Sequence, residues 1–181
     1  MNFFEMLVLS KKLSFADGSV SLYDQSISVY PVQSIMAHIL AISTDVDSVK
    51  SLYSIEKDAV LEYGDTIKKH AVSANTEWIV NTINLYGLGK IQYVTKESDI
   101  SGKLTLENSP FVQYLNGKTT AAVDIILRGI IAGTVSAVLD ANYDVIEIQC
   151  QTSGNQGCEF AIDVKEKLLS QFQQICAAQL P

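Results

Sequence analysis

The feature that most constrains this chain is a change of pattern between residues 124 and 160. A long apolar run, broken by Gly129 and Gly133, is typical of a buried helix and leads into a β-branched segment. A polar, glycine-bearing segment at 151–157 then returns the chain to a second apolar segment, as in a hairpin. The side chains that this hairpin brings together are Glu147, Cys150 and Cys158.

The composition indicates one folded domain with an apolar interior. The 181 residues are 48% hydrophobic and 18% charged, which excludes a disordered chain. A hydrophobic fraction of 48% supplies more apolar surface than the core of one monomer needs, so we expect a homodimer or an internal ligand cavity. We assign residues 1–181 to a single domain, with an N-terminal hairpin extension over about residues 1–30.

Charge and hydropathy exclude two classes of partner. The formal net charge of −7 argues against nucleic acid, because phosphate binding needs a basic patch. The longest apolar run, 125–139, contains Arg128 and is shorter than a membrane span. The first residues lack the pattern of a signal peptide. We therefore expect a soluble, cytoplasmic protein whose three cysteines are thiols or metal ligands rather than a disulfide framework.

The first half of the chain predicts a small sheet followed by helices. Short alternating segments across residues 7–30, with Asp17-Gly18 as a turn, predict antiparallel strands, and residues 2–9 are a candidate helix before them. Apolar residues then recur at helical spacing over three further segments. These helices are expected from Pro31 through Leu40, from about Val46 to His70, and through Trp78 to Gly87.

Beyond Gly89 the apolar period changes to two, which is typical of strands. Thr119 or Thr120 is placed to cap a long helix. The resulting fold class is α+β, with helices packed on an antiparallel sheet. The expected elements are strands at 90–96 and 103–107, a helix at about 121–139, strands at 143–149 and 158–164, and an amphipathic helix from 165 to about 178.

Several short motifs occur in a fixed order along the second half of the chain. The most specific is Glu147-x-x-Cys150 followed eight residues later by Cys158-x-Phe160. The accompanying motifs are Gly87-Leu88-Gly89, Asn108-Ser109-Pro110-Phe111, Gly129-x-x-x-Gly133 and Gly154. In this order they resemble the 4-vinyl-reductase-type small-molecule-binding domain. That family shares its fold with TRAPP vesicle-tethering subunits and, more distantly, with haem-based nitric oxide sensors.

The resemblance implies a structural metal site. In phenol-responsive members of the family, zinc is bound by a cysteine on the long helix, a glutamate and two later cysteines. Glu147, Cys150 and Cys158 match the last three positions, but the helix position, five residues before Gly129, is Asp124 here. Aspartate can also ligate zinc, so the implied site has two thiolates and two carboxylates. Its net charge of −2 would need compensating groups; metal-free buried thiols or a disulfide are the alternatives.

The resemblance also implies a ligand between the central helices and the sheet. The aromatic residues of that region are candidate ligand-binding residues, with an ordinary role in the core as the alternative. Gly129 and Gly133 allow a close approach to the long helix, either by another helix or by a flat apolar ligand. The candidate aromatic residues are Trp78, Tyr86, Tyr93, Phe111 and Tyr114.

The sequence carries no catalytic triad, Walker-type loop or dinucleotide fingerprint, so we expect no nucleotide cofactor and favour binding over catalysis. The leading hypothesis is a homodimeric domain that holds a small apolar or aromatic ligand in an internal cavity. A TRAPP-like scaffold for a protein partner is the alternative. An accessory factor or enzyme of pigment or hydrocarbon reduction is a third.

Overall fold

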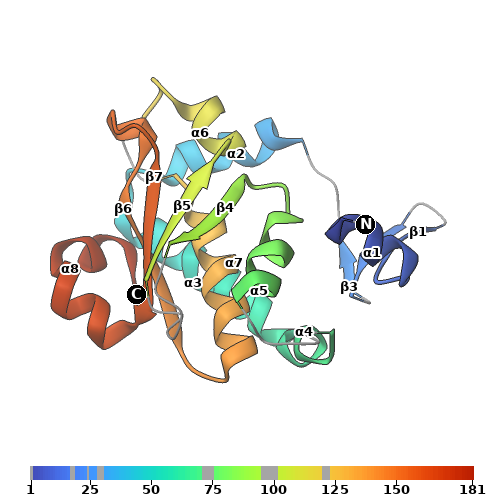
Figure 1. The fold of residues 1–181 in the computed structure, drawn as a ribbon. Coiled ribbons are helices and arrows are strands. Elements are labelled where there is room, and N and C mark those ends of the chain that lie inside the picture. The colour runs from blue at the N-terminus through green and yellow to red at the C-terminus, as the bar shows by residue number, and fades with distance from the viewer. Residues whose placement is uncertain are drawn as a thin grey trace.

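Helices and two antiparallel sheets form an α+β fold in the computed structural model (Figure 1). The structure describes residues 2–16, 19–23, 25–27, 31–70, 76–94, 102–119 and 123–181. The elements are α1 (Phe3–Leu9), β1 (Leu13–Ala16), β2 (Ser19–Leu22), β3 (Gln25–Ile27), α2 (Val32–Ile42), α3 (Val46–Glu62), α4 (Gly64–His70), α5 (Thr76–Asn84), β4 (Lys90–Val94), β5 (Gly102–Glu107), α6 (Pro110–Leu115), α7 (Ile125–Leu139), β6 (Tyr143–Gln149), the 3-10 turn η1 (Gln151–Ser153), β7 (Cys158–Val164) and α8 (Lys165–Gln179).

A four-stranded sheet in the order β4-β5-β7-β6 is the framework of the larger part of the molecule (Figure 1). Strands β6 and β7 are buried at several consecutive positions, because α8 packs on both strands and α7 packs on β6. They pair antiparallel, with a register shift between Glu147 and Gln149. Such a β-bulge re-aims the side chains beside it. Here it lies immediately before Cys150, at the site described below.

Helix α7 runs through the centre of this part and packs closely along α3. A Cβ added at Gly129 would lie 2.5 Å from the Cβ of Glu56, and one added at Gly133 would lie 2.6 Å from the Cβ of Val60. Both glycines therefore face α3, and the close helix packing anticipated as one alternative accounts for them. The absence of a side chain at these positions lets the two backbones approach.

Two predicted helix boundaries were wrong. The helix expected over 46–70 is divided at Tyr63 into α3 and α4, because Gly64 is a poor helix former and packs against Ala137. The long helix starts at Ile125 with Asp124 as its N-cap residue, so residues 123–124, which we expected inside the helix, precede it. The Asp124 side chain makes no capping bond because Ser109 binds it instead.

Some predicted features lie outside the described residues. They are the turn at Asp17-Gly18, residues 28–30 of the N-terminal segments, the end of the strand at 95–96, most of the following turn at 98–101, Thr120 as a cap, and the helix start at 121–122.

The N-terminal elements α1, β1, β2 and β3, which we call the N-terminal module, stand to one side of the larger sheet (Figure 1). Leu7, Leu13 and Leu22 are buried inside the module. It contacts the rest of the chain through Tyr23, whose ring lies 5.9 Å from that of Trp78 in α5. This contact places the module against the face of α5 that carries Trp78.

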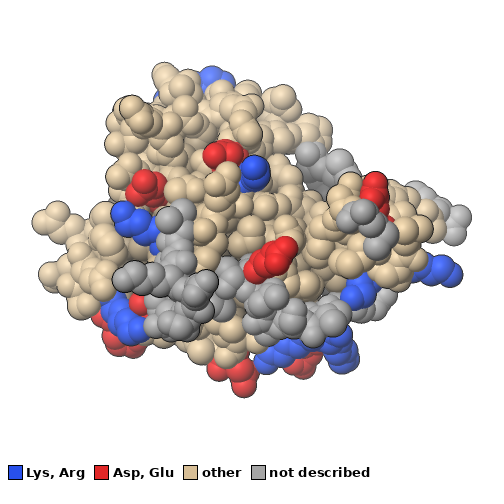
Figure 2. Space-filling model, in the orientation of Figure 1, with Lys and Arg blue, Asp and Glu red and all other residues tan. Residues whose placement is uncertain are grey.

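Two surface properties bear on function. Among the described residues, no helix is long and apolar enough to cross a membrane. Figure 2 shows Lys and Arg scattered among acidic side chains on the described part of one face, without a single basic patch there. This distribution agrees with the acidic net charge of −7.

Candidate metal centre and ligand cavities

Four potential metal ligands meet beside the β-bulge. Asp124 precedes α7, Glu147 lies on β6, Cys150 follows β6, and Cys158 begins β7. One ligand atom from each lies within 4.8 Å of the other three, and all four residues are buried. The hairpin register supplies three of them, and the start of α7 lies across the hairpin to supply the fourth. The structure thus brings together the four residues that the sequence pattern selected.

Three of the four carboxylate oxygens of this group have no hydrogen-bond partner. Asp124 Oδ1 accepts a hydrogen bond from Ser109 Oγ at 2.9 Å. Asp124 Oδ2 and both carboxylate oxygens of Glu147 are buried without a hydrogen-bond partner. Buried polar atoms are nearly always hydrogen-bonded, because desolvation without compensation costs several kcal/mol. Three such oxygens at one point create a strong demand for a cation.

Each of the two thiols has a polar contact within the protein. Cys150 Sγ lies 2.8 Å from Thr152 Oγ1, and the backbone N–H of Gln151 donates to Cys158 Sγ at 3.4 Å. Contact with the Cys158 thiol lowers the pKa of Cys150 to about 5, whereas the same contact raises the pKa of Cys158. One thiolate therefore forms readily, and the second needs a nearby positive charge.

Burial opposes ionisation of the two carboxyl groups. It raises the pKa of Asp124 to about 7 and holds the pKa of Glu147 well above its ordinary value. Negative charge on Asp124 and Cys150 repels negative charge on Glu147 and raises its pKa further. A divalent cation would reverse this balance, so the donor set fits a metal such as zinc.

The sequence analysis missed a buried cation beside this group, having treated Arg128 only as an interruption of the apolar run. Arg128 lies one turn after Asp124 and its side chain is fully buried. Its guanidinium is 5.3 Å from the centre of the Tyr53 ring. Burial lowers the pKa of Arg128, and the neighbouring Glu147 and Asp124 act against this shift by favouring its charged form. A charged Arg128 would reduce the net charge of a zinc site with four anionic ligands from −2 to −1, so it supplies part of the compensation. The available signal was an arginine at i+4 from a candidate ligand.

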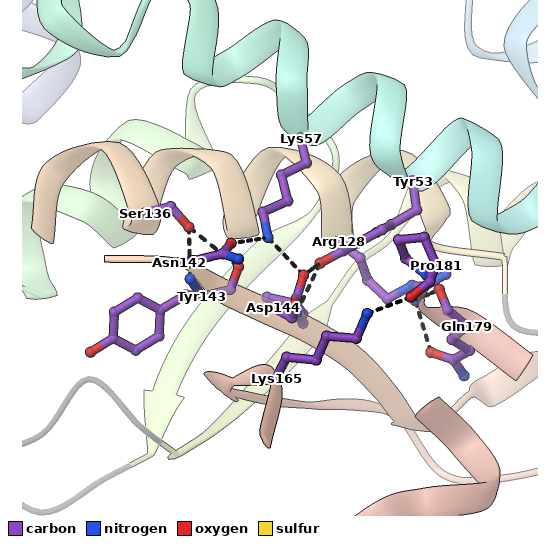
Figure 3. Close-up of polar contacts among 11 residues, drawn as sticks. Tyr53, Lys57, Arg128, Ser136, Asn142, Tyr143, Asp144, Lys165, Gln179 and Pro181 are labelled. Carbon is purple, nitrogen blue, oxygen red and sulfur yellow. Dashed lines mark hydrogen bonds and ion pairs between the residues drawn. The ribbon is translucent and has the colours of Figure 1, made fainter. Parts of the chain in front are cut away.

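Gln179, at the end of α8, contacts Arg128 (Figure 3) and also Glu147, a candidate metal ligand. Its Oε1 accepts hydrogen bonds from Arg128 Nη1 at 2.9 Å and from the backbone N–H of Glu147 at 2.8 Å. Its Nε2 donates to the carbonyl of Glu147 at 2.9 Å. One amide side chain thus satisfies both backbone groups of Glu147 and ties α8 to the site. No sequence pattern indicated this role.

A second polar network fastens α3 to β6 (Figure 3). The Tyr53 hydroxyl donates to Asp144 Oδ1 at 2.7 Å and accepts from the backbone N–H of Val145 at 3.1 Å. Lys57 Nζ donates to Asp144 Oδ1 and to Asn142 Oδ1, each at 2.7 Å. Because Tyr53 also lies under Arg128, this network supports the arginine beside the metal ligands.

The five candidate ligand-binding aromatics occupy different places. Trp78 contacts Tyr23 of the N-terminal module, and Tyr86 and Tyr93 line two separate cavities. Phe111 is fully buried in α6, and the ring of Tyr114 lies under Lys118 Nζ at 3.4 Å. Sequence spacing could not separate these environments, because all five are aromatic residues in apolar segments.

The space between α5, α7 and the large sheet, which we call the central space, is apolar and closed. Its volume is about 10 Å³, close to the space needed by one water molecule. A ligand can enter it only if these walls move apart. Its lining residues are Ile79, Val80, Ile83, Ile91, Tyr93, Leu104, Ile131, Val135 and Ile162.

Comparison with known proteins identifies the fold. No protein-family model matches the chain, and no curated protein matches it in sequence. Among solved structures, it is similar to the phenol-responsive sensory domain of the transcription activator PoxR with phenol. The TM-score is 0.76 at 16% identity, over 96% of this chain and 95% of that one.

Two further structures are similar to most of the chain. A vinyl-4-reductase family protein from Methanocaldococcus jannaschii has a TM-score of 0.53 at 20% identity, over 76% of this chain and 83% of its own. Subunit 3 of a trafficking protein particle complex from Naegleria fowleri, covalently bound to palmitic acid, has a TM-score of 0.52 at 14% identity, over 74% and 90%. The chain therefore has a vinyl-4-reductase-like fold.

Proposed function

We propose that this chain is a non-catalytic small-molecule-binding domain with a structural zinc site formed by Asp124, Glu147, Cys150 and Cys158. The observation that carries the metal is the group of three buried carboxylate oxygens without partners. The proposal of a small ligand is supported by the fold, which the chain shares with a sensory domain described with phenol.

The proposed zinc clamps the β6–β7 hairpin to the start of α7. Its four ligands come from three parts of the chain that are distant in sequence, so bound metal would resist their separation. Four protein ligands complete a tetrahedral shell and leave no position for a reacting water, which favours a structural role over a catalytic one. Arg128 keeps the metal-bound centre from carrying two uncompensated negative charges.

The proposed ligand is small and apolar or aromatic, and it occupies the central space after α5 and the sheet separate slightly. The walls there are almost entirely aliphatic, with Tyr93 as the residue that carries a polar group. Such a wall offers an apolar body favourable burial of about 25 cal/mol per Å². It offers little to a charged molecule.

Metal analysis with matched cysteine variants tests the metal part of the proposal. The wild type, expressed with zinc available, should carry one zinc per chain in native mass spectra. Cys150→Ala should lose the metal and melt about 10 °C lower. The reason is that several kcal/mol of metal-binding free energy are lost, and each kcal/mol of lost stability lowers the melting temperature by about 2–4 °C. Cys176→Ala is the control, because Cys176 is buried but lies outside the group of ligands.

Equal zinc content in Cys150→Ala and the wild type would overturn the metal assignment. The same native mass spectra also detect any small molecule that remains bound to the protein. An organic mass released on denaturation supports the binding role, and its loss in Val80→Phe would place the ligand in the central space, which Val80 lines. Retention of that mass in Val80→Phe would show that the ligand does not occupy the central space.

A scaffold role is the second candidate, and the surface of the N-terminal module favours it. Phe4, Leu9 and Phe15 are 50%, 74% and 66% exposed, and large apolar side chains exposed on one small module favour a protein contact. We propose that this surface forms a homodimer or binds a protein partner. Light scattering over a range of concentrations should give twice the monomer mass; a monomer mass throughout would leave only a different protein as partner.

A further inference from the structure

A second cavity lies between the N-terminal module and the helices of the larger part. Its volume is about 240 Å³, and it is largely enclosed. One wall belongs to β2, β3 and the residue between them, and the other belongs to α4, α5 and their flanking tyrosines. The described lining residues are Leu22, Tyr23, Ser26, Ile27, Tyr63, Thr66, Ile67, Thr82 and Tyr86. We call it the hydroxyl cavity.

The lining of the hydroxyl cavity is apolar over most of its surface, but it carries several hydroxyl groups and, among the described residues, no charge. Six of its nine described residues carry a hydroxyl group, and none carries a charge. Burying an ion without a counter-charge costs far more than burying a neutral polar group that finds hydrogen bonds. The chemistry of the walls therefore selects neutral molecules that donate and accept hydrogen bonds.

The hydroxyl groups bind one another only weakly. The Tyr63 and Tyr86 oxygens are 3.3 Å apart, and the Tyr23 and Thr82 oxygens are 3.5 Å apart. Good hydroxyl hydrogen bonds are near 2.7–2.8 Å, so these contacts are at the outer limit. Burial raises the pKa of Tyr63 and of Tyr86, which keeps both phenols protonated and able to donate. A guest could therefore make shorter hydrogen bonds to Tyr63, Tyr86 and Thr82 than these two contacts.

The size of the cavity limits its guest. Pockets for drug-sized molecules measure about 300–1,000 Å³, and this cavity lies below that range. It is nevertheless many times larger than the space that a single water needs. A molecule with one ring fits this volume, and hydroxyl groups on both walls suit a molecule with polar groups at two positions.

We propose that the hydroxyl cavity is a second ligand site, which takes a neutral one-ring molecule bearing two hydroxyl or carbonyl groups. The guest bridges the N-terminal module to α4 and α5. This site is separate from the central space, because Thr82 lines it from one face of α5 while Ile79 and Ile83 line the central space from another. It does not depend on the metal centre.

Three matched probes test the chemistry by isothermal titration calorimetry on the full chain. The first is 1,3-dihydroxybenzene, the second is 1,3-dimethylbenzene of similar shape without hydroxyls, and the third is the anion 3-hydroxybenzoate. The proposal expects the dihydroxy probe to bind at least about tenfold more tightly than the other two, since each hydrogen bond contributes about 0.5–1.5 kcal/mol. Equal binding of the dimethyl probe, or no binding of the dihydroxy probe at millimolar concentration, overturns it.

Paired variants test the location. The double variant Thr82→Val with Tyr86→Phe removes two hydroxyl groups at nearly constant side-chain shape. It should weaken binding of the dihydroxy probe about tenfold or more. Thr134→Val is the control, because Thr134 is equally buried in α7 but outside the cavity, and it should leave binding unchanged. Thr66→Phe, which fills the hydroxyl cavity, should abolish binding, whereas Val80→Phe, which fills the central space, should not.

The outcomes separate this site from the function proposed above. If Val80→Phe abolishes binding of the dihydroxy probe and Thr66→Phe does not, the second site is overturned, whereas the proposed function as a binding domain is unaffected. Binding that survives Val80→Phe and fails in Thr66→Phe supports the second site, whatever the zinc content proves to be.

Discussion

Two regions of the molecule depart from the usual distribution of side chains in opposite directions. Around α7 and the β6–β7 hairpin, Asp124, Arg128 and Glu147 are buried, although charged residues are normally exposed. In the N-terminal module, Leu9 and Phe15 are mostly exposed, although they are large and apolar. Each departure supports one of the proposals above: a bound cation for the buried acids and a covering apolar surface for the module.

The two departures differ in energy. Leaving a buried charge without a partner costs about 3–5 kcal/mol, so the buried group should dominate the stability of a single chain. Burying an exposed phenylalanine or leucine contributes about 1.5–3 kcal/mol, but only when a second surface covers it. The first region should therefore control folding and metal content, and the second should control association.

The largest effect is expected from Arg128→Met. It removes the buried positive charge beside Asp124 and Glu147, and we expect the free energy of unfolding to fall by about 3–5 kcal/mol in urea denaturation. Lys167→Met is the control, since Lys167 pairs with Asp163 at 3.4 Å but is 58% exposed and should change stability by less than about 1 kcal/mol. Equal effects from the two variants would contradict a special role for the buried charge.

Gly133→Ala should have the next largest effect on stability. The added Cβ would lie 2.6 Å from the Cβ of Val60 and 2.7 Å from the carbonyl oxygen of Lys57, so α3 and α7 must move apart. We expect a loss of about 1–3 kcal/mol in the same assay. Gly157→Ala is the control, because nothing lies within 4 Å of a Cβ there. A neutral Gly133→Ala would mean that the helices are not in close contact.

Zinc binding should release protons and weaken in acid. Because burial raises the pKa of Asp124 to about 7, this carboxyl is largely protonated at pH 6 in the metal-free protein and must lose its proton to bind zinc. The zinc affinity should therefore fall as pH falls, by up to tenfold per pH unit for each proton released, which is about 1.4 kcal/mol. Calorimetric titrations at pH 6 and pH 7, in buffers of different ionisation enthalpy, measure the protons directly.

A zinc affinity that is independent of pH would show that the carboxyl groups are not ligands. Asp124→Asn provides the matched variant, since it removes the titrating group while keeping an oxygen donor. It should bind zinc more weakly but release fewer protons.

The smallest effect on the stability of one chain is expected from Phe15→Asp. Phe15 is 66% exposed, so the free energy of unfolding of the monomer should change by less than about 0.5 kcal/mol. The mass of any dimer in light scattering should nevertheless fall toward that of the monomer. Ile55→Asp is the control, because Ile55 is 62% exposed on α3, outside the N-terminal module. Dissociation by Ile55→Asp alone would place the interface on the helical side.

Local pattern predicted the β6–β7 hairpin well. The strand bounds expected from the sequence, 143–149 and 158–164, agree with β6 and β7. Both strands are short runs of β-branched and aromatic residues bounded by polar turn residues, so neighbours in sequence determine them. The Glu-x-x-Cys spacing within that hairpin was therefore sufficient to select Glu147, Cys150 and Cys158.

Packing between distant elements decided what the local pattern could not. The break at Tyr63 depends on Gly64 meeting Ala137, and the role of Gln179 depends on a contact with Arg128 across 51 positions. The hydroxyl cavity likewise needs residues of the N-terminal module and of two helices in one place. None of these neighbours can be inferred from the period of an apolar pattern.

The sequence by itself determined the kinds of donor, their spacing in the hairpin and the α+β class. Only the tertiary structure decided that Asp124 reaches the thiols and that Arg128 offsets part of the charge of this group. The physical reason is that a side chain on a helix rotates by about 100° per residue, so a start that is wrong by one residue points a ligand elsewhere. The start of α7 depends on how Asp124 meets Ser109, a contact between residues 15 positions apart.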